Sequence, residues 1–100
     1  MKTLGLTYTK VGDAGLAHLP PDLKCLRLAG TKVTDAGLVA VARLTNLEEL
    51  HLHENQITDT GLAHLERLPK LKTLMIMNTQ VTDAGAVKLN KKLPALKIHR

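Results

Sequence analysis

Apolar residues recur in the pattern L-x-x-L-x-L along the chain, in copies that begin at residues 1, 23, 47 and 71. The first copy starts with Met instead of Leu. The last two apolar positions of each copy are two residues apart, a spacing that places them on one face of a β-strand. The pattern therefore predicts strands near residues 3–6, 25–29, 49–53 and 73–77. A truncated fifth copy begins at Leu96.

A second motif follows each predicted strand. It reads T-D-A-G-L at residues 34–38, with variants at 12–16, 58–62 and 82–86. Thr or Asp at this point accepts a hydrogen bond from a free N–H of a helix's first turn, and Asp suits the positive end of the helix dipole. In the third copy leucines follow at residues 62, 65 and 68, which gives the helix one apolar stripe. We predict helices near residues 13–19, 35–44, 59–68 and 83–92.

The glycine in this motif is unfavourable in a helix by about 1 kcal/mol relative to alanine. Its recurrence indicates close backbone packing between strand and helix, with a special backbone dihedral as the alternative explanation.

The two motifs together divide the chain into repeats 1–22, 23–46, 47–70 and 71–95, with a truncated fifth repeat at 96–100. One strand, turn and helix cannot bury its own leucines, whereas stacked units share one continuous core. We therefore predict one α/β domain over residues 1–100. It is a solenoid with a curved parallel sheet inside and helices outside.

The full pattern, L-x-x-L-x-L-x-x-[N/C/T]-x-L, resembles that of leucine-rich repeat proteins over residues 1–98. T-D-A-G-L resembles a bacterial type of this family, which is similar to ribonuclease-inhibitor-like repeats and to the cysteine-containing repeats of F-box proteins. The family's Asn/Cys position is occupied here by Thr9, Thr31, Asn55 and Thr79, so hydroxyl groups are expected to make most of the loop hydrogen bonds.

The resemblance implies a non-catalytic module that binds a protein partner with the concave face of its sheet. Two alternatives are an adaptor that recognises substrates in a ubiquitin-ligase-like system and a structural spacer in a longer solenoid. An adaptor requires a ligase-docking segment, for which 100 residues of repeat leave no room.

Positions 3, 5 and 7 of each strand copy should point away from the core onto the concave face. The central ones are the predicted contact residues: Arg27, Glu49, His51, His53, Met75 and Met77. Arg and Met are enriched at protein interfaces. The alternative is that these side chains form a solvated surface with no ligand.

His51 and His53 also suggest a metal site, because they share one strand face. Glu49, Cys25 and the two methionines could add ligands for a soft ion. Against this, an open sheet offers no pocket that excludes water, and no second shell is recognisable. Cys25 and His51 should lie offset on adjacent strands without oxyanion donors, which argues against a nucleophile pair. We therefore expect no metal, no cofactor and no catalytic residue.

Composition excludes several classes of protein. The chain is 44% hydrophobic but has one Tyr, no Phe, no Trp and no Ser. Serine nucleophiles are therefore excluded, and base-stacking surfaces are not expected with one aromatic residue. The single cysteine excludes an internal disulfide, which favours a cytoplasmic location. The net charge of +5 is confined to residues 88–100. We interpret it as a solvated tail and expect neither specific nucleic-acid binding nor a membrane span.

Neither end of the repeat array has a recognisable capping segment. Leu4, Leu6, Val11, Leu16 and Leu19 have no preceding repeat to cover them. Uncovered terminal repeats reduce the solubility and stability of a solenoid. We expect the chain to be part of a longer array, to self-associate through its ends, or to be only marginally stable alone.

Overall fold

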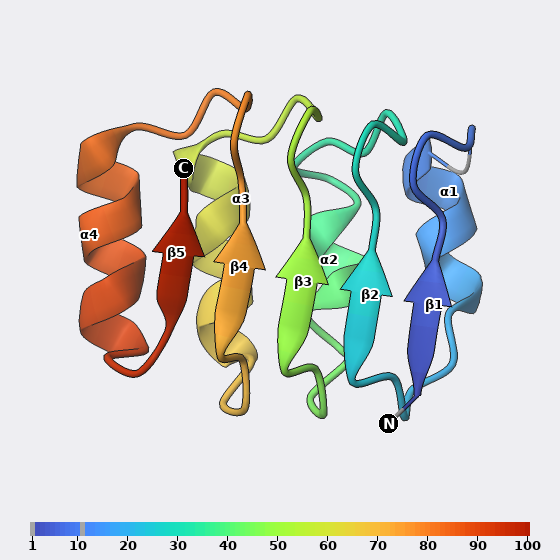
Figure 1. The fold of residues 1–100 in the computed structure, drawn as a ribbon, viewed down its shortest axis with the longest axis horizontal. Coiled ribbons are helices and arrows are strands. Elements are labelled where there is room, and N and C mark those ends of the chain that lie inside the picture. The colour runs from blue at the N-terminus through green and yellow to red at the C-terminus, as the bar shows by residue number, and fades with distance from the viewer. Residues whose placement is uncertain (1, 11) are drawn as a thin grey trace.

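The computed structural model describes residues 2–10 and 12–100. It contains one parallel sheet of five strands in the order β1-β2-β3-β4-β5, so each strand pairs with its neighbours in sequence (Figure 1). The strands are β1 Thr3–Gly5, β2 Cys25–Arg27, β3 Glu49–His51, β4 Thr73–Met75 and β5 Lys97–His99. Each of the four predicted strands is present, although each is shorter than predicted. The predicted solenoid is confirmed.

Helical segments connect the strands and lie on one side of the sheet, which leaves the other face open (Figure 1). The α-helices are α1 Gly12–Gly15, α2 Leu38–Val41, α3 Asp59–His64 and α4 Asp83–Lys92; 3-10 turns η1 Leu16–His18 and η2 Leu65–Arg67 extend the first and third. In the described parts of the chain, no helix has the length and apolar character needed to cross a membrane.

Helix α4 has the predicted bounds, whereas α2 is much shorter than the predicted 35–44. The difference has a local cause. Gly37 and Leu38 donate their N–H groups to carbonyls three residues back, at Thr34 and Asp35, and Arg43 donates to Ala40 in the same way. These are tight turns that flank one α-helical turn.

The strand register shows which residues are equivalent. Leu4 lies opposite Leu26, Leu26 opposite Leu50, Leu50 opposite Leu74, and Leu74 opposite Ile98. By this register the fifth unit begins at Ala95, one residue before the predicted start at Leu96. The sequence pattern misaligned it because Leu96, the second residue of this unit, is apolar and buried.

The core runs continuously through the repeats and is made mainly of leucine, with some Val and Ile. The predicted core residues Leu50, Leu52, Leu62 and Leu65 are all buried. In the first repeat, Leu16 is also buried, whereas Leu4, Leu6 and Leu19 are half-buried. Val11 lies outside the described residues. Of these four leucines, Leu16 is fully covered within this chain.

The T-D-A-G motif links each repeat to the next. The carboxylate of Asp35 accepts hydrogen bonds from the backbone N–H and the hydroxyl of Thr58, one repeat further on. Asp13 binds Thr34 and Asp59 binds Thr82 in the same way. Of the two residue types predicted to cap the helix, Thr and Asp, the aspartate instead binds the next repeat. Threonines cap α3 and α4: Thr58 accepts from Thr60 N and Thr82 from Gly85 N.

The motif's glycine makes room for this link. A Cβ on Gly61 would lie 2.3 Å from Oδ1 of Asp35 and 2.8 Å from a methyl carbon of Leu38. In the same way, a Cβ on Gly37 would collide with Asp13 and one on Gly85 with Asp59. None of the three glycines has a positive φ. The glycine is therefore required by contact between successive helical segments, and neither strand–helix packing nor a special dihedral accounts for it.

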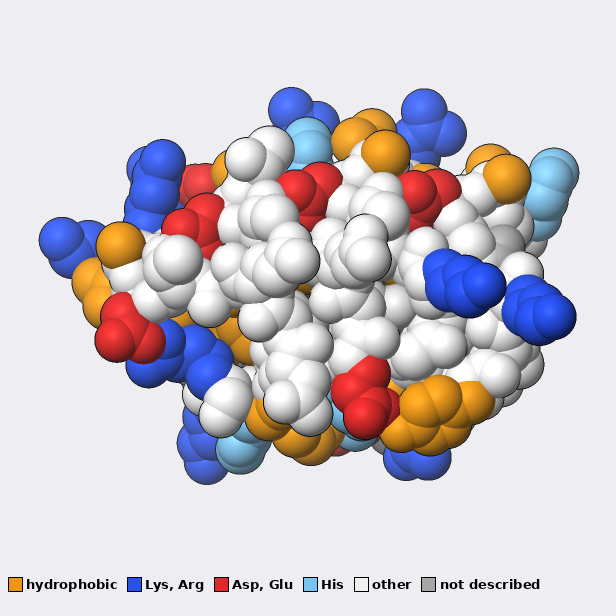
Figure 2. Space-filling model, turned by 90° about the horizontal axis from the view of Figure 1, so that it is seen from above, with side chains coloured by type: hydrophobic (Ala, Val, Ile, Leu, Met, Phe, Trp, Pro, Cys, Tyr) orange, Lys and Arg blue, Asp and Glu red, His pale blue; other side chains and the backbone are white. Residues whose placement is uncertain are grey.

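At the turn after each strand, residue 8 of the repeat has a left-handed backbone. The φ angles of Tyr8, Gly30, Glu54 and Asn78 all lie between 56° and 63°. Tyr8 lies over Gly30, where a Cβ would be only 2.4 Å from the ring, and its hydroxyl donates to Glu54. One aromatic side chain thus connects the first and third repeats. Figure 2 shows this end of the molecule, with acidic side chains in a row across a largely uncharged surface.

Candidate binding surface on the sheet

The open face of the sheet presents its side chains in two rows that run across the strands. One row passes through Thr3, Cys25, Glu49, Thr73 and Lys97, and the other through Gly5, Arg27, His51, Met75 and His99. His53 and Met77 follow two residues after His51 and Met75. The structure therefore brings the predicted residues Arg27, Glu49, His51 and Met75 together on adjacent strands.

Lys97 and His99 extend both rows, although we did not predict them as site residues. They lie on β5, opposite Thr73 and Met75, and both are exposed. The signal that could have identified them is the fifth repeat, read one residue earlier than Leu96. Lys97, which belongs to the basic tail, places a positive charge at this end of the face.

The side chains of this face differ in burial more than the alternating pattern predicts. Arg27 is exposed, and His51, His53, Met75 and Met77 are half-buried. Cys25 and Ala29, which should also be accessible at this face, are completely buried with 0% exposure. Cys25 is therefore not available as an exposed contact, and neighbouring side chains must cover it.

Glu49 lies beside both Cys25 and His51. The thiol of Cys25 donates to Oε2 of Glu49 at 3.0 Å, across the pair β2–β3. Nε2 of His51 lies 3.5 Å from the same oxygen. The potential ligand atoms of the three residues all lie within 4.8 Å of one another. Cys25 and His51 lie offset on adjacent strands, as predicted, and Glu49 contacts both of them.

The pKa values of this cluster reflect the same contacts. Burial raises the pKa of the Cys25 thiol, and its hydrogen bond to Glu49 raises it further, while the guanidinium of Arg27 acts in the opposite direction. The pKa of Glu49 is lowered, first by the hydrogen bond from Cys25; burial opposes this, and His51 and Arg27 add to the lowering. At neutral pH the pair is therefore a thiol that donates to a carboxylate.

Both histidines have a buried ring nitrogen that is not hydrogen-bonded. These are Nε2 of His51 and Nδ1 of His53, and neither has a partner among the residues that the structure describes. The two rings lie 6.2 Å apart between centroids. A buried polar atom without a partner costs about 1–3 kcal/mol, so a native structure normally offers an explanation for it.

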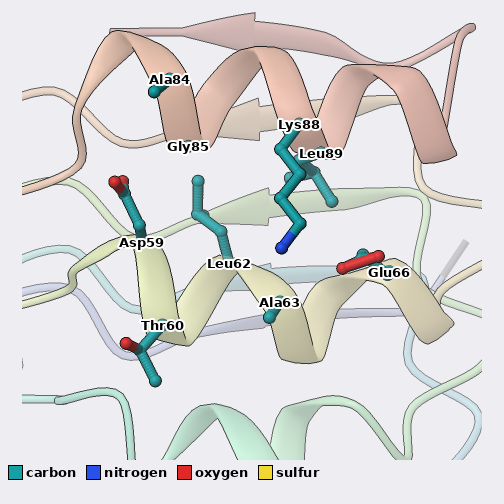
Figure 3. Close-up of a pocket in the computed structure, with 9 residues that line it drawn as sticks. All are labelled: Asp59, Thr60, Leu62, Ala63, Glu66, Ala84, Gly85, Lys88 and Leu89. Carbon is teal, nitrogen blue, oxygen red and sulfur yellow. The ribbon is translucent and has the colours of Figure 1, made fainter.

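The helical side of the molecule has a groove of its own, between α3 and α4. It is lined partly by small and apolar side chains, and Lys88 extends from α4 across it towards α3 (Figure 3). Asp59 lies at one end of the groove, where it also makes its link to Thr82. None of the predicted contact residues lines this groove, so it is separate from the surface on the sheet.

Comparison with known proteins agrees with the repeat architecture. A model described as Leucine Rich repeats (2 copies) matches residues 21–66, and a second, described as Leucine Rich repeat, matches residues 67–89. No match was found among curated protein sequences.

One similar solved structure is a chain in the structure of Chaetomium Mex67:Mtr2 subunits, with 18% identity and a TM-score of 0.66. The alignment covers 87% of this chain and 64% of that chain, so this chain spans less than two thirds of its structural neighbour. Identity at this level shows likeness of fold alone. The two sequence models, which together span more than two thirds of the residues, and the five parallel strands lead to the same conclusion: the chain belongs to the leucine-rich repeat proteins.

Proposed function

We propose that this chain is a non-catalytic module that binds a protein partner on the open face of its sheet. The observation that carries the proposal is the one-sided arrangement of the fold, since all the helical segments lie on one face (Figure 1). Leucine-rich repeat domains are generally protein-binding modules. The similar Chaetomium chain comes from a structure that contains subunits of two proteins, Mex67 and Mtr2.

The chemistry of the open face supports a protein partner. Arg27 is exposed beside His51, and Met75 lies on the other side of His51 in the same row. Arg and Met are enriched in protein interfaces, while an acidic residue, Glu49, and two histidines add polar contacts. We assign the contact role to Arg27, Glu49, His51, His53, Met75 and Met77.

Affinity capture from the source organism's lysate tests this proposal with two matched variants. Arg27→Ala/Met77→Ala changes the open face, and Val39→Ala/Val87→Ala removes two exposed apolar side chains from the helical side. We expect the first variant to lose proteins that the original chain captures and the second to retain them. Both variants must give the original circular dichroism spectrum. If the two behave alike, the structural-spacer alternative is favoured, because a spacer does not depend on this face.

A further inference from the structure

We propose that Cys25, Glu49 and His51 form a binding site for a divalent transition metal ion, with Zn²⁺ as the ion that the ligand set fits. This goes beyond the protein-binding function and revises our expectation from the sequence that the face holds no metal. The inference rests on three features: the mutual positions of the ligand atoms, the burial of Cys25 and of the His51 ring nitrogen, and that nitrogen's lack of a hydrogen-bond partner among the described residues.

The positions are close to those of a tetrahedral site. With a Zn–S bond of about 2.3 Å and Zn–N and Zn–O bonds of about 2.0–2.2 Å, neighbouring ligand atoms lie about 3.3–3.6 Å apart. Here Sγ of Cys25 lies 3.0 Å from Oε2 of Glu49, and Nε2 of His51 lies 3.5 Å from that oxygen. The third separation is at most 4.8 Å. Side-chain rotations alone can therefore place the ion between the three atoms.

The backbone fixes these positions. Cys25 and Glu49 are direct partners in the pairing of β2 with β3, and His51 is the next residue on the same face of β3. Ligands on paired strands lose little conformational freedom on binding, which favours a preorganised site.

Burial addresses the objection raised from the sequence, that an open sheet cannot exclude water. Cys25 is 0% exposed, and the side chain of His51 is 18% exposed. Nε2 of His51 is itself buried without a hydrogen-bond partner in the described part of the chain, 3.5 Å from the carboxylate. A metal ion at this point would supply that partner.

The charges balance when the thiol loses its proton. Zn²⁺ displaces the proton that Cys25 now donates to Glu49, so that an S–Zn bond forms and one proton passes to solvent. The thiolate and carboxylate then neutralise the ion, and neutral His51 completes three protein ligands. Water fills the fourth position. The positive guanidinium of Arg27, on β2 opposite His51, disfavours binding of the cation.

Titration with Co²⁺ and Zn²⁺ tests the site on the full chain, purified without a histidine tag. We expect one equivalent of Co²⁺ to give the thiolate-to-cobalt charge-transfer band and the visible bands of tetrahedral cobalt. Zn²⁺ should displace it, and calorimetry in two buffers should show release of one proton. Zinc should also delay unfolding, because ligands that bind only the native state stabilise it.

Matched variants assign the ligands. Cys25→Ser and His51→Ala should each weaken zinc binding by more than the ~10–100-fold that loss of an outer partner of a metal site costs. His53→Ala, two residues further on the same face, should weaken zinc binding less than tenfold. His64→Ala on α3 should leave zinc binding unchanged. Arg27→Gln should tighten binding, because it removes a like charge.

Two results would overturn the proposal. One is the lack of saturable 1:1 binding at micromolar metal concentrations. The other is binding that survives in Cys25→Ser with the cobalt spectrum unchanged, which would place the ion at surface histidines. Circular dichroism shows whether each variant is folded. If Cys25→Ser does not fold, His51→Ala provides a second test. Since no partner protein is needed, the outcome is independent of the proposed binding function.

Discussion

Asn55 makes hydrogen bonds that the threonines at the same position of other repeats do not. Thr9, Thr31 and Thr79 each donate a hydroxyl to the carbonyl three residues earlier, which confirms that hydroxyls serve most of these turns. The amide of Asn55 donates to Leu28 O and Leu52 O, and its oxygen accepts from the N–H groups of Thr31 and Val33. Asn55 thus joins the second and third repeats, whereas each hydroxyl serves its own repeat.

We expect Asn55→Thr to lower the free energy of unfolding by about 1–3 kcal/mol, because the shorter side chain leaves buried N–H groups without an acceptor. Denaturant unfolding measures the loss. Thr79→Ala, which removes a single bond within one repeat, is the control and should cost less. Equal losses in the two variants would contradict the role given to Asn55.

Asp59 gives a second prediction, for acid pH. The hydroxyl and N–H of Thr82 hold the pKa of Asp59 below its ordinary value. The stability this contributes is complete above the unfolded pKa, about 3.9, and is lost as the pH falls through the folded pKa. Asp59→Asn should therefore lower stability at pH 7 by no more than about 1 kcal/mol, because solvent screens the site. The difference from the original chain should disappear near pH 2. A difference that is independent of pH would show that the charge plays no part.

Successive helical segments touch through one aspartate and one glycine per repeat. The contact explains why the motif keeps a residue that disfavours helix: Gly61 lies against Asp35, and the Asp35 carboxylate holds Thr58. Helix propensity alone predicts that alanine at this position would be better by about 1 kcal/mol. The packing predicts instead that alanine at this position lowers the stability.

We expect Gly61→Ala to destabilise the chain by about 1–3 kcal/mol, as overpacking usually does. In an Asp35→Ala background the same substitution should cost much less, since the nearest atom is gone. A double-mutant cycle from denaturant melts measures this coupling. Additive effects of the two changes would mean that the aspartate and the glycine do not meet.

The difference between predicted and observed features follows from the range of the contacts involved. Strands and helices were predictable because their periodicity lies within one repeat, as Leu50 and Leu52 show. The link from Asp35 to Thr58 could not be predicted in this way, because it joins two repeats. The motif was therefore interpreted as a cap for its own helix. The alternation of apolar and polar residues correctly placed Arg27 and His51 on the open face. It could not show that Cys25 is buried, because this depends on side chains of neighbouring strands.

At the scale of the whole molecule, the core is aliphatic and continuous. Leu52 lies near its centre, 0% exposed, with repeats on both sides. Each repeat shares its leucines with the next, so one cavity weakens two repeats at once.

Leu52→Ala should therefore lower the free energy of unfolding by about 2–5 kcal/mol, the usual cost of a large cavity in a core. Val39→Ala, at an exposed position on α2, is the control and should stay within about 0.5 kcal/mol. Thermal and denaturant melts measure both. A loss below about 1 kcal/mol for Leu52→Ala would contradict the assigned core.

Tyr8 also determines the optical properties of the protein. With no Trp or Phe in the chain, its near-ultraviolet absorption and its fluorescence come from one phenol. The hydrogen bond to Glu54 raises the pKa of Tyr8, so the tyrosinate absorbance should appear above about pH 10 in the folded chain and at the ordinary value in Glu54→Gln. Identical titrations would show that the contact does not persist in solution. The neutral phenol stabilises the fold, and this contribution is lost as the pH rises through the raised pKa.

During unfolding, the fluorescence of Tyr8 reports the separation of the first repeat from the third, while circular dichroism reports all the helices. Curves that coincide indicate a single cooperative transition. A fluorescence change that precedes the loss of helix indicates an array that opens from its first repeat.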